Sequence, residues 1–338
     1  MNWLSDIVRG WSKRWPRVVD LSRGVAMVVT DLHGDWEAYQ RYRDRFLMLH
    51  DQRKADYLII AGDLIHRGDD GEPDRSVEMV LDLIRLRKQY GESIIFLMGN
   101  HEMPHLYGIP LSKGETNYTA SFEAAMGKHR LAILELFHKL PFYVRTQAGV
   151  TICHAGGTAD LSMGSNLIKV FNFSHRNLWA EAASSIAPEE RPSLRWAIAQ
   201  ENGLAYHSLV NLMLDVHNEG DARYDDFMIG HQAAKMDDFG LLWSILFTRN
   251  ELEYGEIGYE LILESMLALF SIGFAPQRVL LSGHINSPNG FTQVNSQQLR
   301  LASGKHALPP QAARYLLFDV RKPIRESAQL VPLLQSVY

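Results

Sequence analysis

The chain has 338 residues, a formal net charge of −5 and a single cysteine, Cys153. Hydrophobic residues make up 46% of the sequence and charged residues 22%, a composition typical of a globular protein with a sizeable core. This composition excludes an internal disulfide framework, gives no positive field for nucleic acid, and offers no apolar run of the roughly 18 to 20 residues that a membrane span requires.

Residues 1–24 are predicted to form an N-terminal arm that packs on the main domain. The arm alternates Trp3, Trp11 and Trp15 with basic residues, so an interfacial helix that touches a membrane surface is the alternative. The apolar run around MVVTDLHG is too short and begins too late for a signal peptide. Because a lone cysteine also fits a reducing compartment, a cytoplasmic location is expected, without a nucleic-acid partner.

Five short apolar runs rich in β-branched residues are predicted to be buried strands. They cover residues 25–29, 57–61, 93–98, 149–153 and 278–282. Helical periodicity separates the first three runs, and this alternation of strand and helix predicts parallel pairing. After His284 the pattern changes to short strands with turn residues between them, which suggests antiparallel pairing.

Further helices are predicted over residues 121–140, 193–217 and 259–272. The segment 158–257 is mostly helical or irregular, and we interpret it as an insertion or cap on the main domain. The expected fold is therefore of the α/β class, an α+β sandwich of central β-sheets flanked by helices. It forms a single domain over residues 25–338.

Each of the five predicted strands is followed by a side chain that can bind a metal or move a proton. These side chains are Asp31, His33, Asp63, Asn100, His101, His154 and His284. The carboxyl ends of parallel strands form the edge where α/β sheets bind their ligands. Oxygen and imidazole donors without a thiolate suit a pair of divalent ions, with Mn²⁺ preferred and Fe or Zn²⁺ as alternatives. Two such ions, bridged by Asp63, can hold a phosphate and activate a water molecule as nucleophile.

The segments DLHGD, GDLIHRG, GNHE, HAGG and the late GH resemble, in order, the motifs of the calcineurin-like metallophosphoesterases. The closest branch is the phosphoprotein phosphatase family, which cleaves phosphoserine and phosphothreonine. The resemblance is strong over residues 25–157 and moderate over 279–320. LLWS at residues 241–244 looks like the first part of the family segment LLWSDP.

The resemblance implies a role for each matching residue. Asp31, His33 and Asp63 would hold the first metal, and Asp63, Asn100, His154 and His284 the second. His101 would be the general acid, and Arg67 and Asn100 would contact the phosphate. Arg249 is the candidate for a second phosphate-gripping arginine, and His306 stands where the family often has a tyrosine near the phosphate.

Two positions depart from the family pattern. His66 replaces the aspartate that orients the catalytic histidine, and Ile245 replaces the aspartate of LLWSDP. His66 is therefore a candidate catalytic residue in its own right, while Asp69, Asp70 or Glu102 could supply the missing carboxylate. Among the other histidines, His105 is expected in a surface loop and His175 in an exposed or capping position.

The leading functional hypothesis is a two-metal phosphomonoester hydrolase that acts on phosphorylated protein or peptide through a metal-bridging hydroxide. The first alternative is hydrolysis of a small phosphorylated metabolite or a dinucleoside polyphosphate, which a capping insertion would favour. The second alternative is a metal-binding or scaffold protein with impaired catalysis, suggested by His66 and Ile245.

Overall fold

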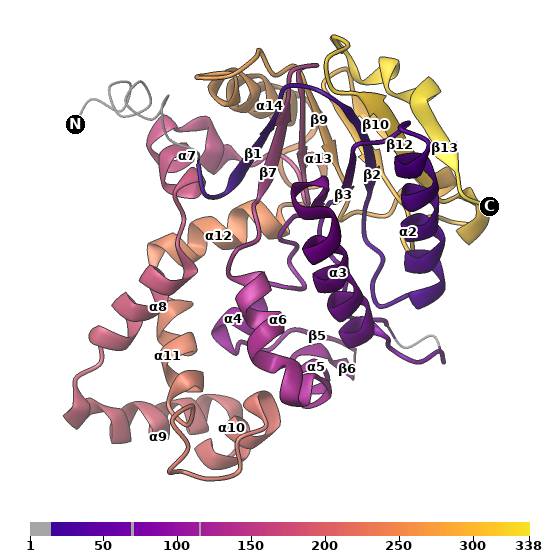
Figure 1. Ribbon diagram of the computed structural model, residues 1–338. Helices are drawn as coiled ribbons and strands as arrows, with labels where there is room; N and C mark the ends of the chain where they lie inside the picture. The colour runs from indigo at the N-terminus through magenta and orange to yellow at the C-terminus, as the bar shows by residue number, and fades with distance from the viewer. Residues whose placement is uncertain (1–14, 69–70, 115) are drawn as a thin grey trace.

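A computed structural model of the chain describes residues 15–68, 71–114 and 116–338. Two β-sheets lie face to face, with helices on their outer sides (Figure 1). The six-stranded sheet has the order β1 (Val18–Leu21), β7 (Tyr143–Thr146), β8 (Val150–Cys153), β9 (Val279–Ser282), β11 (Gln298–Leu301), β10 (Phe291–Asn295). The five-stranded sheet has the order β13 (Leu334–Ser336), β12 (Arg314–Asp319), β2 (Val25–Val29), β3 (Tyr57–Ile60), β4 (Ile94–Phe96).

All five predicted strands are present: β2, β3, β8 and β9 lie inside the two sheets, and β4 is the edge strand of the five-stranded sheet. Strands β2, β3 and β4 pair in parallel, as their alternation with helices predicts. The C-terminal strands pair mostly antiparallel, since β10 pairs with β11 and β12 pairs with both β13 and β2, but β11 also pairs in parallel with β9. The predicted α/β sandwich is therefore confirmed.

Side-chain alternation along the strands divides the core into two parts. Ala26 and Val28 of β2 belong to the apolar layer between the sheets, together with Val150 and Ile152 of β8. Met27 and Val29 point to the other face and join the core under the helices. The near-continuous apolar run that marks β2 in the sequence thus reflects burial on both faces.

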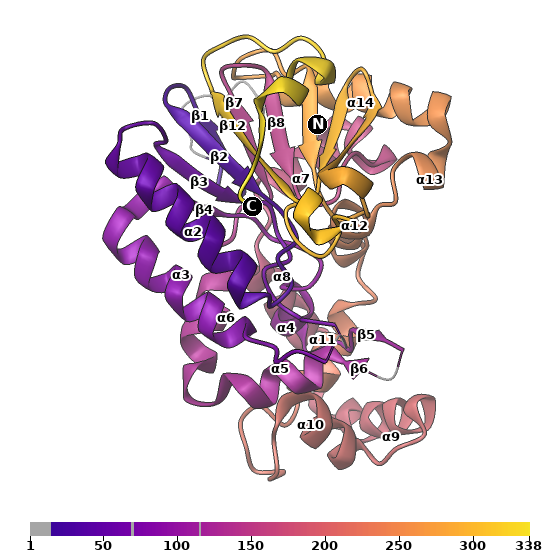
Figure 2. The same cartoon turned by 90° about the vertical axis from the view of Figure 1, so that its right-hand side faces the viewer.

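Helices cover the outer face of each sheet (Figure 2). Helices α2 (Trp36–Asp51) and α3 (Ser76–Tyr90) pack on the five-stranded sheet, and α14 (Glu256–Phe270) packs on the six-stranded sheet. The ring of Phe270 meets the edge of Tyr143 at a centroid distance of 4.8 Å, which joins α14 to β7. The short helix α4 (Pro104–Tyr107) begins after the loop that follows β4, and all four of its residues are buried.

Two of the predicted helices are each divided by a glycine. The segment 121–140 consists of α5 (Tyr118–Met126) and α6 (Arg130–Phe137), separated by a turn at Gly127. The segment 193–217 consists of α9 (Arg191–Asn202) and α10 (Tyr206–Leu214), where Gly203 ends α9 with a φ of 66°. In both cases the apolar periodicity continues past the break, so the sequence predicts one long helix where the structure has two.

The segment 158–257 is helical, as predicted. Besides α9 and α10 it contains α7 (Gly164–Phe171), α8 (His175–Ser184), α11 (Asp226–Ala233), α12 (Asp237–Phe247) and α13 (Glu251–Tyr254). Helices α9, α10 and α11 enclose a small apolar core of their own, centred on Leu209, Val210 and Phe227. In Figure 1 helices α9 and α10 lie at the end of the molecule opposite the sheets.

The N-terminal region differs from the predicted arm. Strand β1 pairs in parallel with β7, so Val18–Leu21 belongs to the six-stranded sheet. Trp15 packs against Phe171 with a centroid distance of 5.6 Å, whereas Trp3 and Trp11 lie outside the described residues. Across the described part of the chain, no helix has both the length and the apolar character that crossing a bilayer demands.

The hairpin of β5 (Ser112–Lys113) and β6 (Thr116–Asn117) precedes α5. It lies on the same side of the molecule as α4 and α5 in Figure 2. This hairpin and the loops that follow β9 and β11 border the candidate site.

Candidate active site

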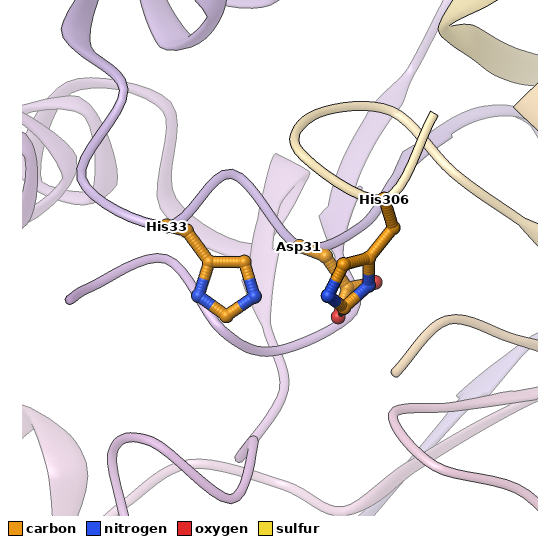
Figure 3. Close-up of side chains that lie close together, drawn as sticks. All are labelled: Asp31, His33 and His306. Atoms are coloured by element: carbon orange, nitrogen blue, oxygen red, sulfur yellow. Dashed lines mark ion pairs between the residues drawn. The ribbon is translucent and has the colours of Figure 1, made fainter. Parts of the chain in front are cut away.

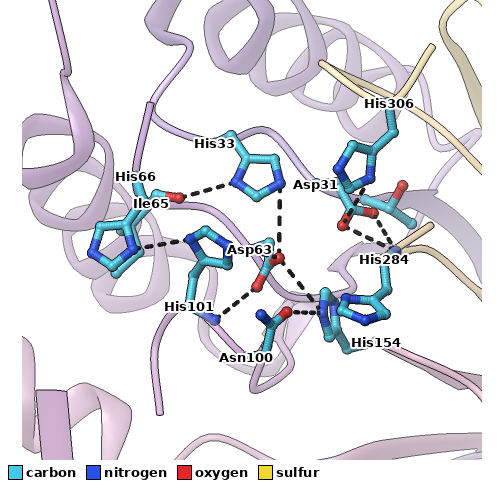
Figure 4. Close-up of polar contacts among 12 residues, drawn as sticks. Asp31, His33, Asp63, Ile65, His66, Asn100, His101, His154, His284 and His306 are labelled. Carbon is cyan, nitrogen blue, oxygen red and sulfur yellow. Dashed lines mark hydrogen bonds and ion pairs between the residues drawn. The ribbon is translucent and has the colours of Figure 1, made fainter. Parts of the chain in front are cut away.

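The predicted metal ligands converge at the carboxyl ends of five strands (Figure 4). Asp31 and His33 follow β2, Asp63 follows β3, and Asn100 follows β4, all in the five-stranded sheet. From the six-stranded sheet, His154 follows β8 and His284 follows β9. One group of polar side chains is therefore assembled from both halves of the sandwich.

Asp63 lies at the centre of this group. Its Oδ2 is 3.5 Å from Nε2 of His154 and 3.7 Å from Nε2 of His33. Its Oδ1 accepts a hydrogen bond from the backbone N–H of His101 at 3.0 Å. Asp63 is only 1% exposed, so its carboxylate has lost nearly all contact with water. This is the arrangement that the sequence predicts for a bridging carboxylate.

Asp31 forms a second centre, on the other side of His33. The backbone N–H of His284 donates to both of its carboxylate oxygens at 3.0 Å. Nδ1 of His306 lies 3.4 Å from Oδ1 of Asp31 (Figure 3), and its ring meets His33 edge-on at 5.1 Å. The sequence predicts His306 as a substrate contact, but its position beside Asp31 also makes it a candidate metal ligand.

The donor atoms fit divalent metal ions. Three groups have ligand atoms within 4.8 Å of one another: Asp31, His33 and His306; His33, Asp63 and His101; Asp63, His154 and His284. Oδ1 of Asn100 lies 2.8 Å from Nε2 of His154 and extends the last group. Ligands about 2.0–2.2 Å from a shared ion are themselves about 3 to 3.7 Å apart, as several of these atoms are.

The electrostatics of the site also favour bound cations. Burial, reinforced by the charge of Asp31, raises the pKa of Asp63 well above its usual range. Burial, followed by the neighbouring His306, lowers the pKa of His33 to about 3. Burial, followed by the neighbouring His154, lowers the pKa of His284 to about 3 as well. Two buried carboxylates beside neutral imidazoles are unfavourable alone, but deprotonated carboxylate and neutral imidazole are the forms that bind metals.

The loops that carry these ligands are held by Glu102. Its carboxylate accepts hydrogen bonds from the backbone N–H groups of Asp63, Leu64 and Gly99 at 3.1, 2.9 and 3.0 Å. Glu102 therefore ties the end of β3 to the end of β4. Since its oxygens face the backbone, it does not supply the carboxylate that His66 replaces, and Asp69 and Asp70 lie outside the described residues.

His66 contacts His101 directly. The two Nδ1 atoms are 2.9 Å apart, and the His66 ring stacks on Tyr118 with an angle of 8° between the planes. Burial, followed by the neighbouring His105 and His33, lowers the pKa of His66 well below its usual range. His66 therefore occupies the position of the family aspartate as a neutral, hydrogen-bonding group.

His105 and His175 are both buried, whereas the sequence suggests a surface loop for His105 and an exposed or capping position for His175. Nε2 of His105 lies 2.8 Å from Nε2 of His66. Nδ1 of His175 shares a hydrogen bond of 2.8 Å with the hydroxyl of Tyr107. The short helix α4 turns His105 inward, and a sequence without tertiary contacts gives no sign of that direction.

The two predicted phosphate-gripping arginines lie in different places. Arg67 is half-buried next to the site, with Nη1 3.6 Å from Oδ1 of Asp35. Arg249 is exposed at the start of α13, where its backbone N–H donates to Glu253 at 3.2 Å. Neither arginine lines the cavity over the metal ligands. The exposed placement of Arg249, outside the cavity lining, gives no support to its predicted role.

A cavity of about 410 Å³ opens above the ligands. Its lining includes Asp63, Asn100 and His101 on the floor, and Tyr118, Asn286, Lys305, His306 and Leu308 around them. A Cβ on Gly68 would lie 2.2 Å from Nζ of Lys305, so glycine leaves the space for this ammonium group. Tyr118, Asn286 and Lys305 are absent from the sequence-based site, although Lys305 is adjacent to His306.

The helical segment 158–257 contributes none of the residues that line this cavity. The β5–β6 hairpin, α5 and the loops after β9 and β11 supply the lining instead. Asn250 of this segment donates a hydrogen bond to the carbonyl oxygen of Ala155, next to His154, at 2.9 Å. Since no residue of the segment lines the cavity, the hypothesis that it caps the candidate metal ligands finds no support.

Comparisons with known proteins agree with this geometry. The family model described as Calcineurin-like phosphoesterase matches residues 25–234, more than half of the chain. A symmetrical bis(5'-nucleosyl)-tetraphosphatase of Nitrosococcus oceani is 29% identical over 133 residues. That alignment covers 38% of this chain and 42% of the relative, so it spans less than half the length of that protein.

Two solved structures resemble the chain more loosely. A protein serine/threonine phosphatase from Saccharomyces cerevisiae has a TM-score of 0.49 at 12% identity, covering 93% of this chain and 81% of its own. A cold-active protein-tyrosine phosphatase of a Shewanella species has a TM-score of 0.45 at 12% identity, covering 96% and 82% respectively.

The family match supports the sequence-based prediction of a metal-dependent phosphatase, and it includes four of the strand ends that carry the candidate ligands. With the sandwich of two sheets and the clustered histidines and aspartates also in place, the chain belongs to the calcineurin-like phosphoesterase family.

Proposed function

We propose that the protein is a two-metal phosphomonoester hydrolase. The observation that carries this proposal is the group of donor atoms around Asp63 and Asp31 on the floor of the cavity. Asp31, His33 and Asp63 would hold one divalent ion, with His306 as a further candidate ligand, and Asp63, Asn100, His154 and His284 would hold the other. Such ions, when bound, supply Lewis acidity and activate water as a nucleophile near neutral pH.

The proton for the leaving group would come from His101. Its ring lines the cavity, and its Nε2 is 3.8 Å from Oδ2 of Asp63, a position that supports this role. As water oxygen bonds to phosphorus, the ester P–O bond breaks and the departing oxygen takes the proton from Nε2. The proton released by the water restores the imidazolium, and the products are inorganic phosphate and an alcohol.

The phosphate itself favours the acid form of His101. Burial, followed by the imidazole of His33, lowers the pKa of His101 well below its usual range. A negative charge within a few ångströms stabilises an imidazolium, and a phosphate dianion brings that charge into the cavity. Lys305, and Arg67 if it leaves Asp35, would balance the remaining charge on the non-bridging oxygens.

For the substrate, we favour a phosphorylated protein or peptide. None of the cavity-lining residues comes from the helical segment, so the space above the ligands is bordered by a hairpin and loops that a polypeptide can approach. A dinucleoside polyphosphate is the second candidate, supported by the identity shared with the bis(5'-nucleosyl)-tetraphosphatase. Lys305 beside the ligands would suit the additional phosphates of such a molecule.

The proposal is tested by removing metal from the purified protein and restoring Mn²⁺, Zn²⁺ or Fe. Turnover of p-nitrophenyl phosphate, a phosphopeptide panel and diadenosine tetraphosphate is then measured. We expect metal-dependent release of phosphate, with phosphopeptides preferred by kcat/KM. If no substrate turns over while two metals are bound, the protein is a metal-binding or scaffold protein and the proposal is wrong.

The role of His101 is tested separately with His101→Asn. We expect unchanged metal content and a loss of about 10²- to 10⁴-fold in kcat for esters with poor leaving groups, because these depend most on proton donation. Activated esters should lose much less. His217→Asn, at an exposed position outside the cavity, is the matched control. An equal loss for all esters would contradict the acid role.

A further inference from the structure

Beyond His101 and His66, a continuous line of polar side chains runs from the cavity into the interior. Nδ1 of His101 contacts Nδ1 of His66 at 2.9 Å, and Nε2 of His66 contacts Nε2 of His105 at 2.8 Å. Nδ1 of His105 then faces Oε1 of Glu123 at 3.5 Å. The other oxygen of Glu123 accepts a hydrogen bond from Nε of Arg130 at 2.7 Å.

This line is shielded from water. The side chains of His105 and Glu123 are fully buried, and His66 is 2% exposed. Phe122 packs against the rings of both His66 and His105, with centroid distances of 5.6 and 4.6 Å. In such surroundings each nitrogen–nitrogen contact needs one N–H and one lone pair, since a pair of lone pairs or a pair of N–H groups would leave buried polar atoms unsatisfied.

The carboxylate of Glu123 decides which nitrogen donates and which accepts in each contact along this line. A carboxylate ion-paired to arginine can only accept, and Nδ1 of His105 and Oε1 of Glu123 have no other hydrogen-bond partner among the described residues, so a hydrogen on Nδ1 of His105 is favoured over a lone pair. Nε2 of a neutral His105 is then an acceptor and receives the N–H on Nε2 of His66. Nδ1 of His66 in turn accepts the N–H on Nδ1 of His101. The reverse order would place a lone pair of His105 against the carboxylate.

We propose that His105 and Glu123 are positioning residues that act through His66 to fix the tautomer and orientation of His101. The expected effect on kcat rests on the proposed phosphatase function, whereas the expected tautomer of His101 does not. The family aspartate would meet the catalytic histidine directly. In this chain the carboxylate is displaced by two imidazoles and lies on α5.

The consequence for catalysis follows from the fixed direction. His101 donates its Nδ1–H to His66 both before and after it releases a proton from Nε2. The line therefore needs no rearrangement during turnover, and only the nitrogen that faces the cavity changes its proton. Without Glu123, both directions become possible, and a share of the protein would hold His101 in the opposite tautomer.

The structural part is tested by NMR on protein with ¹⁵N-labelled histidine, loaded with diamagnetic Zn²⁺ at pH 8. Two-bond ¹H–¹⁵N couplings report which ring nitrogen carries the hydrogen, with assignments from single histidine-to-glutamine variants. We expect Nδ1–H on His101 and His105, and Nε2–H on His66. The reverse pattern would overturn the proposal whether or not the protein hydrolyses any ester.

The kinetic part uses Glu123→Gln, because an amide can donate or accept and so releases the direction of the line while keeping its shape. For phenyl phosphate, a poor leaving group, we expect kcat to fall by about tenfold or more, within the range that general acids contribute. For p-nitrophenyl phosphate we expect a loss of about threefold or less, since an activated leaving group depends less on protonation. KM and metal content should not change.

Two further variants complete this experiment. Glu135→Gln makes the same substitution on α6 at a partly exposed carboxylate that pairs with Lys139 and Arg176, and it should leave both substrates unaffected. Glu123→Asp keeps the negative charge and should recover part of the loss. Equal losses for both esters in Glu123→Gln, or no loss, would overturn the proposal. Absence of turnover in the wild type would instead refute the proposed function and leave the NMR result to decide this inference.

Discussion

Five of the candidate site residues have left-handed backbone conformations, which residues other than glycine rarely adopt. Asp31, His33, Asp63, His66 and His284 all have φ between 44° and 71°. A left-handed conformation is unfavourable by about 1–2 kcal/mol for such residues, and it persists only where the surrounding structure enforces it. Their concentration at one sheet edge indicates that the tight turns serve to aim side chains at a common point.

Gly283 allows a test of how closely the side chains at this sheet edge are packed. A Cβ at this position would lie 2.0 Å from Oδ2 of Asp31 and 2.8 Å from Cβ of Thr30. Since Asp31 is anchored by the N–H of His284, Gly283→Ala must displace a candidate ligand. We expect metal affinity, measured by calorimetric titration, to fall about tenfold or more, in line with the 1–3 kcal/mol that overpacking costs.

The matched control is Gly240→Ala in α12, where a Cβ would meet nothing within 4 Å. This change should leave metal affinity unaltered and raise stability by up to about 1 kcal/mol, because alanine favours the helix. Unchanged metal affinity in Gly283→Ala would show that Asp31 does not take part in the metal site.

The positions of site residues were predictable where the motif and the strand end coincide. Asp31, Asp63, Asn100, His154 and His284 come together because parallel strands deliver their carboxyl ends to one edge. His105 and Glu123 were not predictable, since a histidine or glutamate on a short helix looks solvent-facing until tertiary contacts bury it. Lys305 was not predictable either, since its Nζ lies beside Gly68, from a segment distant in the sequence.

Among the elements, the strands that were predicted are apolar, and the strands that were missed carry a charged residue. Strands β2, β3, β4, β8 and β9 are predominantly apolar because both of their faces are buried, and the only polar residues in β8 and β9 are the buried Thr151 and Ser282. Strands β1 and β7 escaped prediction because each carries a charge, Asp20 and Arg145. These side chains form a bidentate ion pair with hydrogen bonds of 2.7 and 2.8 Å. Arg145 also donates to the carbonyl oxygen of Phe270 at 2.8 Å.

Helix α11 carries an unfavourable charge that makes its stability depend on pH. Burial raises the pKa of Asp226 to about 6, although Arg130 and Arg223 oppose the shift. In the unfolded chain an aspartate has a pKa of about 3.9. Below that pH both states are protonated and the residue contributes nothing. As the pH rises to 6 the unfolded state loses its proton first, so the folded state becomes less stable.

We therefore expect Asp226→Asn to stabilise the protein more as pH rises. The gain in free energy of unfolding should be larger by about 1–2 kcal/mol at pH 8 than at pH 4.5. Urea unfolding at the two pH values measures it. Asp237→Asn, at an exposed position in the first turn of α12, controls for the loss of a first-turn carboxylate. A gain that is equal at both pH values would contradict the assignment.

At the scale of the whole molecule, the candidate metal site joins the two sheets. Asp31, Asp63 and Asn100 extend from the five-stranded sheet, whereas His154 and His284 extend from the six-stranded sheet. No single segment contains the full set of ligands, so only the folded sandwich can bind the ions tightly. Metal binding and global stability should therefore be linked.

An ion that binds only the folded state adds about 2.7 kcal/mol of stability at a concentration 100 times its Kd. We expect chelation to lower the Tm of the wild type by several degrees and Mn²⁺ or Zn²⁺ to restore it, as measured by scanning calorimetry. Asp63→Asn should lose this response. Without metal it should melt at or above the temperature of the metal-free wild type, because it removes a buried carboxylate that burial and Asp31 both disfavour.

Asp44→Asn, at an exposed carboxylate on α2, should keep the full wild-type response and serves as the control. A rise in Tm on adding metal that is as large in Asp63→Asn as in the wild type would place the ions elsewhere. A metal-free Asp63→Asn that melts well below the metal-free wild type would mean that Asp63 stabilises the sandwich through its own hydrogen bonds. The expected result instead means that the Asp63 carboxylate destabilises the metal-free protein and that its contribution is to bind the ions between the two sheets.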